Sequence, residues 1–200
     1  ILNKGGRVLI TTPTPAAKPV LDFFAFKLHV ISEPEIADHQ HYYSSADLQA
    51  LTTAQYTAFT SDQVAGLTTD EMALIESADL RALTSTALRA LSSEQIAALT
   101  SDQMGALTTG QVAALTSAQL NNMATVNVVA LTTAQVRALT TAQVTNLSST
   151  QVAIMETADI AALTSAQAAV LSTAAIEALT TDQIQVLTSA ALNALTSAQL

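Results

Sequence analysis

The strongest constraint on the fold is a period of eight residues, which runs from Ser44 to Leu195 as nineteen octads without an insertion or deletion. The consensus octad is L-T-[TS]-[AD]-Q-[VIL]-x-A. Leucine fills its first position except at Phe59, Ile75, Met123 and Met155. A second apolar position recurs five residues later and is interrupted only by Ala168. Such regularity predicts a fold made of stacked copies of one unit.

Neither a single long helix nor a flat strand suits this octad. A straight helix turns about 100° per residue, so eight residues overshoot two turns by about 80° and the leucines would spiral around the axis. In a strand, two positions five residues apart lie on opposite faces. Alanine and glutamine are also poor strand formers.

Short capped helices account for every position of the consensus. With Thr132 as an N-cap, Gln135 lies at the third helical position, N3, and completes a capping box. Leu131 and Val136 then occupy the two positions of a hydrophobic staple. Of the twelve acids in the array, all except Glu177 fall at the cap or in a first turn, where we expect the helix dipole to favour them.

Helices this short are unstable alone and persist only if successive turns of the chain stack and bury the apolar positions. We therefore predict an all-α repeat solenoid of short capped helices over residues 44–200. The sequence leaves open how many octads make one coil of this solenoid. The alanine before most leucines, such as Ala98 and Ala106, is expected to let coils approach closely.

Residues 1–43 differ in pattern and are predicted to form a small β segment that covers a coil of this chain or of a neighbour. Val8, Leu9 and Ile10 lie between a glycine pair and a proline-rich turn, and residues 20–31 alternate apolar and other residues. The latter stretch supplies candidate self-association residues, namely Phe23, Phe24, Phe26, Leu28 and Val30.

Charge excludes two classes of partner. The net charge of −9 arises entirely in the array, which has three arginines and no lysine against twelve acids. An acidic surface repels nucleic acid and anionic membranes. No apolar run reaches the 18 residues expected of a membrane span. Because the chain begins at Ile1 and stops within a repeat, we expect a processed chain or a fragment.

Candidate chemistry is sparse, and we predict no enzyme, cofactor or metal site. His39 and His41, with Asp38 or Glu35, are possible metal ligands, but a polar linker is the simpler interpretation. The array contains no histidine to activate its many hydroxyls, and there is no cysteine. Acid pairs such as Asp70–Glu71 lack the oxygen spacing of calcium loops.

Three octads depart from the consensus at residues 75–79, 123–127 and 155–159. The first and third share the form Glu-x-Ala-Asp after an apolar residue. Contact sites, a longer period and neutral drift remain open as explanations.

The L-T-T-A-Q-V octads resemble the octapeptide repeat arrays of large bacterial exported and cell-surface proteins. The resemblance covers residues 44–200 and carries no catalytic motif. It implies an extracellular or cell-surface location.

Two functions follow as expectations. The first is a structural protein that self-assembles head to tail into an extracellular filament, sheath or surface layer, because the last octad is as apolar as the interior ones. Leu195 and Leu200 are the candidate residues at that end. The alternative is an adhesin stalk or a module that binds surface glycans or ice through hydroxyls recurring once per octad, at Thr53, Ser61, Thr69, Ser101, Thr109 and Thr133. An enzyme would have to use His29, His39 and His41.

Overall fold

A computed structural model describes residues 48–199. Within these residues the chain forms one short α-helix per octad and no strand. The helices are α4 (Thr53–Tyr56), α5 (Ser61–Ala65), α6 (Thr69–Leu74), α7 (Ser77–Ala82), α8 (Ser85–Ala90), α9 (Ser93–Ala97), α10 (Ser101–Ala106), α11 (Thr109–Ala114), α12 (Ser117–Asn121), α13 (Thr125–Val129), α14 (Thr133–Ala138), α15 (Thr141–Thr145), α16 (Ser149–Ile154), α17 (Thr157–Ala162), α18 (Ser165–Ala168), α19 (Thr173–Glu177), α20 (Thr181–Gln185) and α21 (Ser189–Leu192).

The helix α14 shows how one octad begins and ends a helix. Thr132 has an extended backbone, with φ −76° and ψ 154°, and its hydroxyl accepts a hydrogen bond from the Gln135 N–H at 3.3 Å. The Gln135 side chain accepts in return from the Thr132 N–H at 2.7 Å. At the far end Leu139 returns to ψ 136°. This residue therefore ends one helix and directly precedes the next cap, Thr140.

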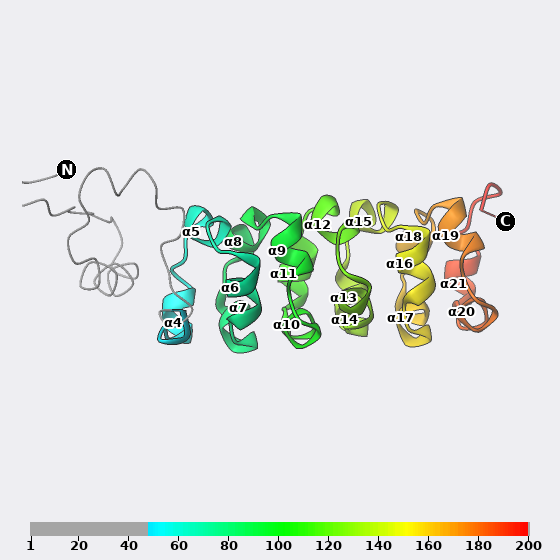
Figure 1. Cartoon of the computed structure of the whole chain (residues 1–200). Helices are drawn as coiled ribbons and strands as arrows, with labels where there is room; N and C mark the ends of the chain where they lie inside the picture. The colour runs from blue at the N-terminus through cyan, green and yellow to red at the C-terminus, as the bar shows by residue number, and fades with distance from the viewer. Residues whose placement is uncertain (1–47, 200) are drawn as a thin grey trace, which may run out of the picture.

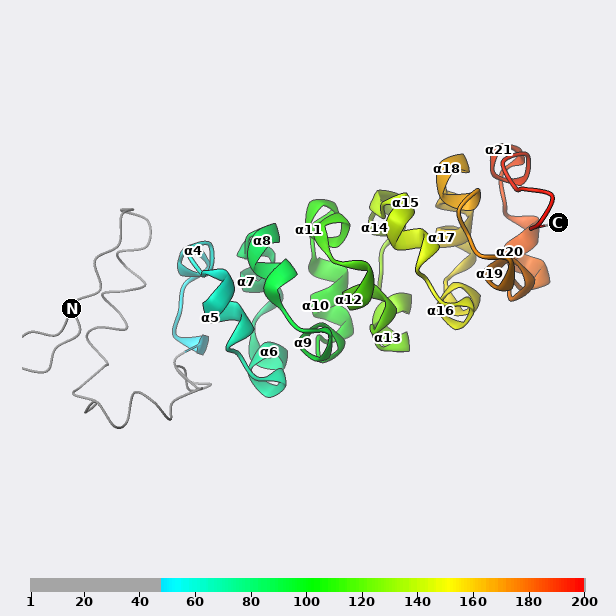
Figure 2. The same cartoon turned by 90° about the horizontal axis from the view of Figure 1, so that it is seen from above.

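Three octads make one coil of the stack. Every helix from α4 to α18 contacts the helix three places later, as in α4 with α7 and α5 with α8. The coils follow one another in a row, with α4 near one end and α21 at the other (Figures 1 and 2). The chain is thus a helical, solenoid-like stack with regular neighbour contacts. The structure supplies the number of octads per coil that the sequence left open.

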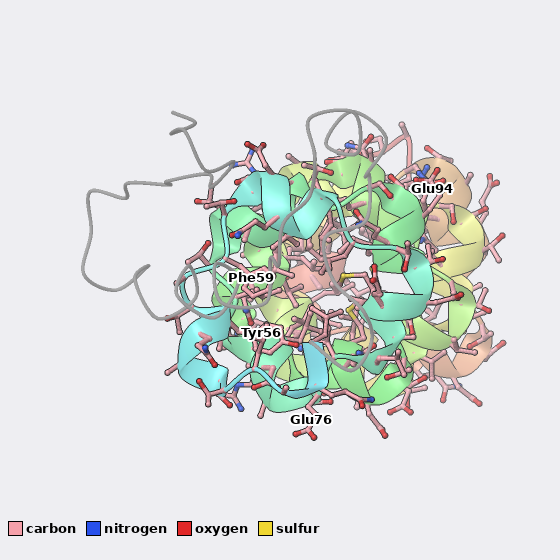
Figure 3. The ribbon with its side chains drawn as sticks, turned by 60° about the vertical axis from the view of Figure 1, so that its left-hand side comes forward. Tyr56, Phe59, Glu76 and Glu94 are labelled. Carbon is pink, nitrogen blue, oxygen red and sulfur yellow. The ribbon has the colours of Figure 1, made fainter. Side chains whose placement is uncertain are left out.

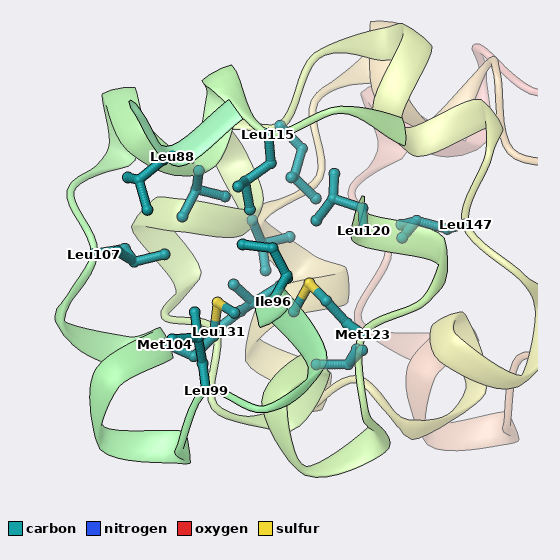
Figure 4. Close-up of a cluster of buried hydrophobic side chains, with 14 of the residues drawn as sticks. Leu88, Ile96, Leu99, Met104, Leu107, Leu115, Leu120, Met123, Leu131 and Leu147 are labelled. Carbon is teal, nitrogen blue, oxygen red and sulfur yellow. The ribbon is translucent and has the colours of Figure 1, made fainter. Parts of the chain in front are cut away.

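The two apolar positions of the octad form one continuous core through the stack. Side chains at the leucine position, from Leu51 to Leu187, are at most 8% exposed. Those at the second position are at most 2% exposed from Leu48 to Ala168. Side chains from successive coils meet in the interior, where Met104 and Met123 lie among leucines (Figure 4). Aromatic rings enter only in the first described coil, where Tyr56 stacks on Phe59 at 5.2 Å.

The all-α prediction for the array is confirmed over the described residues. The predicted β segment of residues 1–43 lies outside them. So do Phe23, Phe24, Phe26, Leu28 and Val30, and this part of the prediction stays a prediction.

Candidate functional site

The glutamine at N3 joins each coil to the one before it. Its side-chain nitrogen Nε2 donates to the backbone carbonyl 31 positions earlier and, in every case except Gln151, also to the carbonyl 28 positions earlier, at the end of a helix in the preceding coil. We call the residues that do so the glutamine ladder: Gln95, Gln103, Gln111, Gln119, Gln135, Gln143, Gln151, Gln167, Gln183 and Gln199. All of them are buried, at 8% exposure or less.

Gln135 shows the geometry of the ladder in full. Its Oε1 accepts from the Thr132 N–H, which closes the capping box. Its Nε2 donates to the carbonyls of Met104 at 3.0 Å and Leu107 at 2.7 Å. The last carbonyls of a helix lack partners within their own helix. One buried amide therefore satisfies the start of its own helix and the end of another.

The sequence alone predicts only the capping half of this role. The missed signal is the choice between glutamine and glutamate at N3. Both residues suit a capping box, yet twelve octads carry Gln and only Glu71 is a glutamate. Because a carboxylate has no N–H to donate, this preference indicates that the position needs a donor.

In the three off-consensus octads, both the N-cap hydrogen bond and the contact of the N3 side chain with the preceding coil are reduced. Their N-cap residues, Glu76, Ala124 and Glu156, accept no side-chain hydrogen bond from the helix. Their N3 residues are short: Asp79, Asn127 and Asp159. The Asn127 amide still donates to the Leu99 carbonyl at 2.8 Å. The asparagine side chain is one methylene shorter than that of glutamine, and its Oδ1 makes no hydrogen bond to the N-cap residue Ala124 or to any other partner.

The pKa values of acids in first turns shift in different directions, depending on whether the side chain points outward or between coils. Glu94, at N2 of α9, lies at the periphery of the molecule (Figure 3). Hydrogen bonds from its own backbone N–H and from Ser92 lower its pKa. Asp159, at N3, points between coils and is 2% exposed, and desolvation raises its pKa. Asp159 does lie in a first turn, as predicted, but there desolvation by burial is the largest influence on its pKa.

The last coil, α19 to α21, exposes the face that every interior coil buries. At the second apolar position Ile184 is 46% exposed and Leu192 is 40% exposed. Leu195 packs against the core but is only partly buried. Leu200, the other candidate at this end, lies outside the described residues. Among residues 48–199, no glutamine amide reaches the carbonyls of this coil.

A second apolar surface lies on the side of the stack. Val126 and Val129, which are 59% and 41% exposed, line a shallow groove with Ser101, Thr125 and Ile154. These residues come from the off-consensus helix α13 and from its neighbours in the stack, α10 and α16. The groove carries no charged side chain.

Comparison with sequence families decides what kind of array this is. The profile of the ALTTAQ repeat matches residues 44–74, 72–109, 123–155 and 152–189, which together are well over half of the chain. The chain belongs to the ALTTAQ repeat family. No curated protein and no solved structure matches it.

Family membership confirms the resemblance to a repeat array over residues 44–109 and 123–189. The ALTTAQ letters are the octad positions from the alanine through the ladder glutamine. These are the residues that cap each helix and join the coils. The family motif therefore contains the N-cap residue and the ladder glutamine of each octad.

Within residues 48–199 of this ALTTAQ repeat chain, no cluster of three or more histidine, cysteine or acidic side chains could hold a metal ion. His29, His39 and His41 lie outside these residues, so their candidate roles stay untested. None of the described helices is both long enough and apolar enough to cross a membrane.

Proposed function

We propose that this ALTTAQ repeat chain is a structural protein without catalytic activity, which assembles head to tail as a subunit of an extracellular filament, sheath or surface layer. The observation that carries the proposal is the stacking itself, in which the apolar side chains of each interior coil are buried by the coil that follows. In the last described coil the corresponding side chains of Ile184 and Leu192 are 46% and 40% exposed. The resemblance to exported repeat arrays supports the extracellular location.

The interior of the stack indicates what would fit this face. Each interior coil receives apolar side chains and glutamine amides from the next coil, as Met104 and Leu107 receive Gln135. A coil of the same repeat therefore matches this face, and the proposal assigns that coil to a second copy of this chain. Contacts of this kind that do not close into a ring produce fibres.

Sedimentation and negative-stain electron microscopy of the 200-residue chain over a range of concentrations test the proposal. We expect assemblies that grow with concentration and appear as rods longer than one stack. The double variant Ile184→Glu/Leu192→Glu should remain monomeric, because it places two charges on the apolar face.

The matched control is Val126→Glu/Val129→Glu, which puts two charges on the lateral groove at similar initial exposure. It should assemble like the unchanged chain. A chain that stays monomeric at all concentrations would refute the proposal. So would equal loss of assembly in both double variants.

The alternative, a stalk or module that binds glycans or ice, draws on the hydroxyls at the first helical position. Five of the six candidates are exposed, at Thr53, Thr69, Ser101, Thr109 and Thr133, while Ser61 is half-buried. Thr133 is nevertheless engaged, because it donates to Asp159 at 2.9 Å. Binding on a glycan array or inhibition of ice recrystallisation by the monomeric double variant would favour this alternative.

A further inference from the structure

Asp159 occupies a ladder position with a side chain that cannot act as a ladder donor when ionised. It lies at N3 of α17, where ladder residues donate to the carbonyl 28 positions earlier, which here is that of Leu131. Its Oδ1 accepts from the Thr133 hydroxyl at 2.9 Å. Its Oδ2 is buried and has no hydrogen-bond partner.

The comparison with Asn127 shows that the side chain is long enough for the ladder contact. Aspartate and asparagine have the same shape, and both side chains stand at N3 of an off-consensus octad. The Asn127 amide reaches the carbonyl 28 positions earlier at 2.8 Å. The two residues differ in that the amide carries hydrogens and an ionised carboxylate does not.

We propose that Asp159 is an acid-responsive contact between coils: its protonated carboxyl donates a hydrogen bond to the Leu131 carbonyl, and ionisation removes that bond and weakens the packing of α17 on α14. Protonation of Asp159 has two effects in this geometry. It supplies the missing donor, and it removes a negative charge from a site that is 2% exposed.

The surrounding charges do not stabilise the ionised form. Desolvation is the largest cause of the raised pKa of Asp159; the hydrogen bond from Thr133 lowers this pKa, and Glu156, the N-cap of the same helix, raises it. On the helices packed against α17, the charged residues are Arg137 in the last turn of α14 and Asp182 in the first turn of α20. Arg137 lies beside the other end of α17, near Ala161 and Ala162.

The sign of the pH effect follows from the raised pKa. A carboxyl that binds its proton more tightly in the folded state contributes full stability below the pKa of the unfolded chain, about 3.9. This contribution is lost as the pH rises through the folded-state pKa. Outward acids such as Glu94, whose pKa is lowered, have the opposite dependence. The effect of Asp159 must therefore be read as a difference between variants at each pH.

The test combines ¹³C NMR titration of the Asp159 carboxyl in the whole chain with thermal unfolding of three variants at pH 3.5 and pH 7. We expect the carboxyl to titrate above about 3.9. Asp159→Asn should raise Tm at pH 7 by about 2–4 °C, because its amide donates permanently, and this difference should shrink at pH 3.5.

Asp159→Ala, which has no donor, should melt below Asp159→Asn at both pH values. Asp182→Asn is the surface-charge control and should not raise Tm at pH 7. Amide hydrogen exchange in 157–163 should slow in the Asn variant at pH 7. Titration at or below about 3.9, or an Asn variant that melts no higher than the unchanged chain at pH 7, would overturn the proposal. These measurements are made at a concentration at which sedimentation shows the chain to be monomeric, because association of the folded chain would itself change Tm. Their outcome is then separate from that of the filament proposal.

Discussion

At the scale of single residues, the ladder glutamine explains more of the structure than any other position. Gln135 is 1% exposed and makes hydrogen bonds in two directions. A buried polar group is costly when it is left without partners. The amide avoids that cost because it accepts from the Thr132 N–H of its own helix and donates to the carbonyls of Met104 and Leu107 in the preceding coil.

Replacing Gln135 separates its two roles. Gln135→Ala should lower the free energy of unfolding by about 1–3 kcal/mol. The chain should still fold, since Ala87, Ala175 and Ala191 occupy this position naturally. Gln135→Glu keeps the capping acceptor but buries a charge beside two carbonyls, so at pH 7 it should cost more, about 3–5 kcal/mol.

Urea unfolding at pH 7 measures both changes. Gln143, one octad later and with equivalent contacts, provides a repeat of the experiment within the same chain. A glutamate variant as stable as the alanine variant would show that the donor role of the amide contributes little.

At the scale of the element, each helix is too short to stand alone. The helices of the described stack have four to six residues, well below the length at which isolated helices become stable. Their ends matter correspondingly more. The hydroxyl cap at one end and the ladder amide at the other take over the hydrogen bonds that a longer helix would make internally.

Removing an N-cap hydroxyl should lower the stability of the chain, and adding one where it is missing should raise it. Thr100→Ala removes the hydroxyl that accepts from the Gln103 N–H at 3.2 Å and should cost about 1 kcal/mol. Ala124→Thr should stabilise by a similar amount, about 1 kcal/mol, because α13 lacks a side-chain cap. Chemical denaturation of the two variants checks both signs. An unchanged or lower stability for Ala124→Thr would mean that this octad cannot accommodate the consensus cap.

The leucine position contributes through packing. Leu99 is 3% exposed within the continuous core. Leu99→Ala should therefore cost about 2–5 kcal/mol, more than the cap variant at the neighbouring residue. Calorimetry on Leu99→Ala and Thr100→Ala gives the comparison directly. A loss at Leu99 no larger than that at Thr100 would contradict the burial of this position.

At the scale of the whole molecule, the described residues form a stack in which each coil contacts its neighbours. Each helix from α4 to α18 packs on the helix three octads later. Stability in such a stack is approximately a sum over coils and the contacts between them. The stability of the stack should therefore depend more on keeping the three-octad register between coils than on the number of coils.

Two changes of length test the importance of register. Deleting residues 92–115 removes one coil of three octads and leaves every remaining ladder position facing its carbonyl. Inserting a single glycine between Leu107 and Thr108 adds one residue but breaks the spacing of 28 that joins Gln135 to Leu107. We expect the deletion to retain cooperative unfolding and the insertion to cost more than about 2 kcal/mol. Circular dichroism melts of both chains measure the two changes in stability. A deletion that lowers stability as much as the insertion would contradict the stacked-coil description.

Local chemistry was predictable from the sequence because it acts within one octad. The T-x-x-Q spacing predicted the cap at Thr132, the box with Gln135 and the burial of Val136, since all these contacts span only a few residues. The charge pattern likewise placed acids in first turns. The candidate residues of 1–43 and Leu200 lie outside the described residues, so their roles stay predictions.

Only the tertiary structure decided what joins one coil to the next. The three-octad coil sets which carbonyl stands 28 residues before each N3 side chain, and no local spacing contains that number. It also decided that Asp159 is buried, although sequence alone gave it the same first-turn setting as the exposed Glu94. The period of eight determined the helix and its cap, because capping is local. The stack determined the ladder, because a donor at N3 finds its acceptors only when another coil is in place.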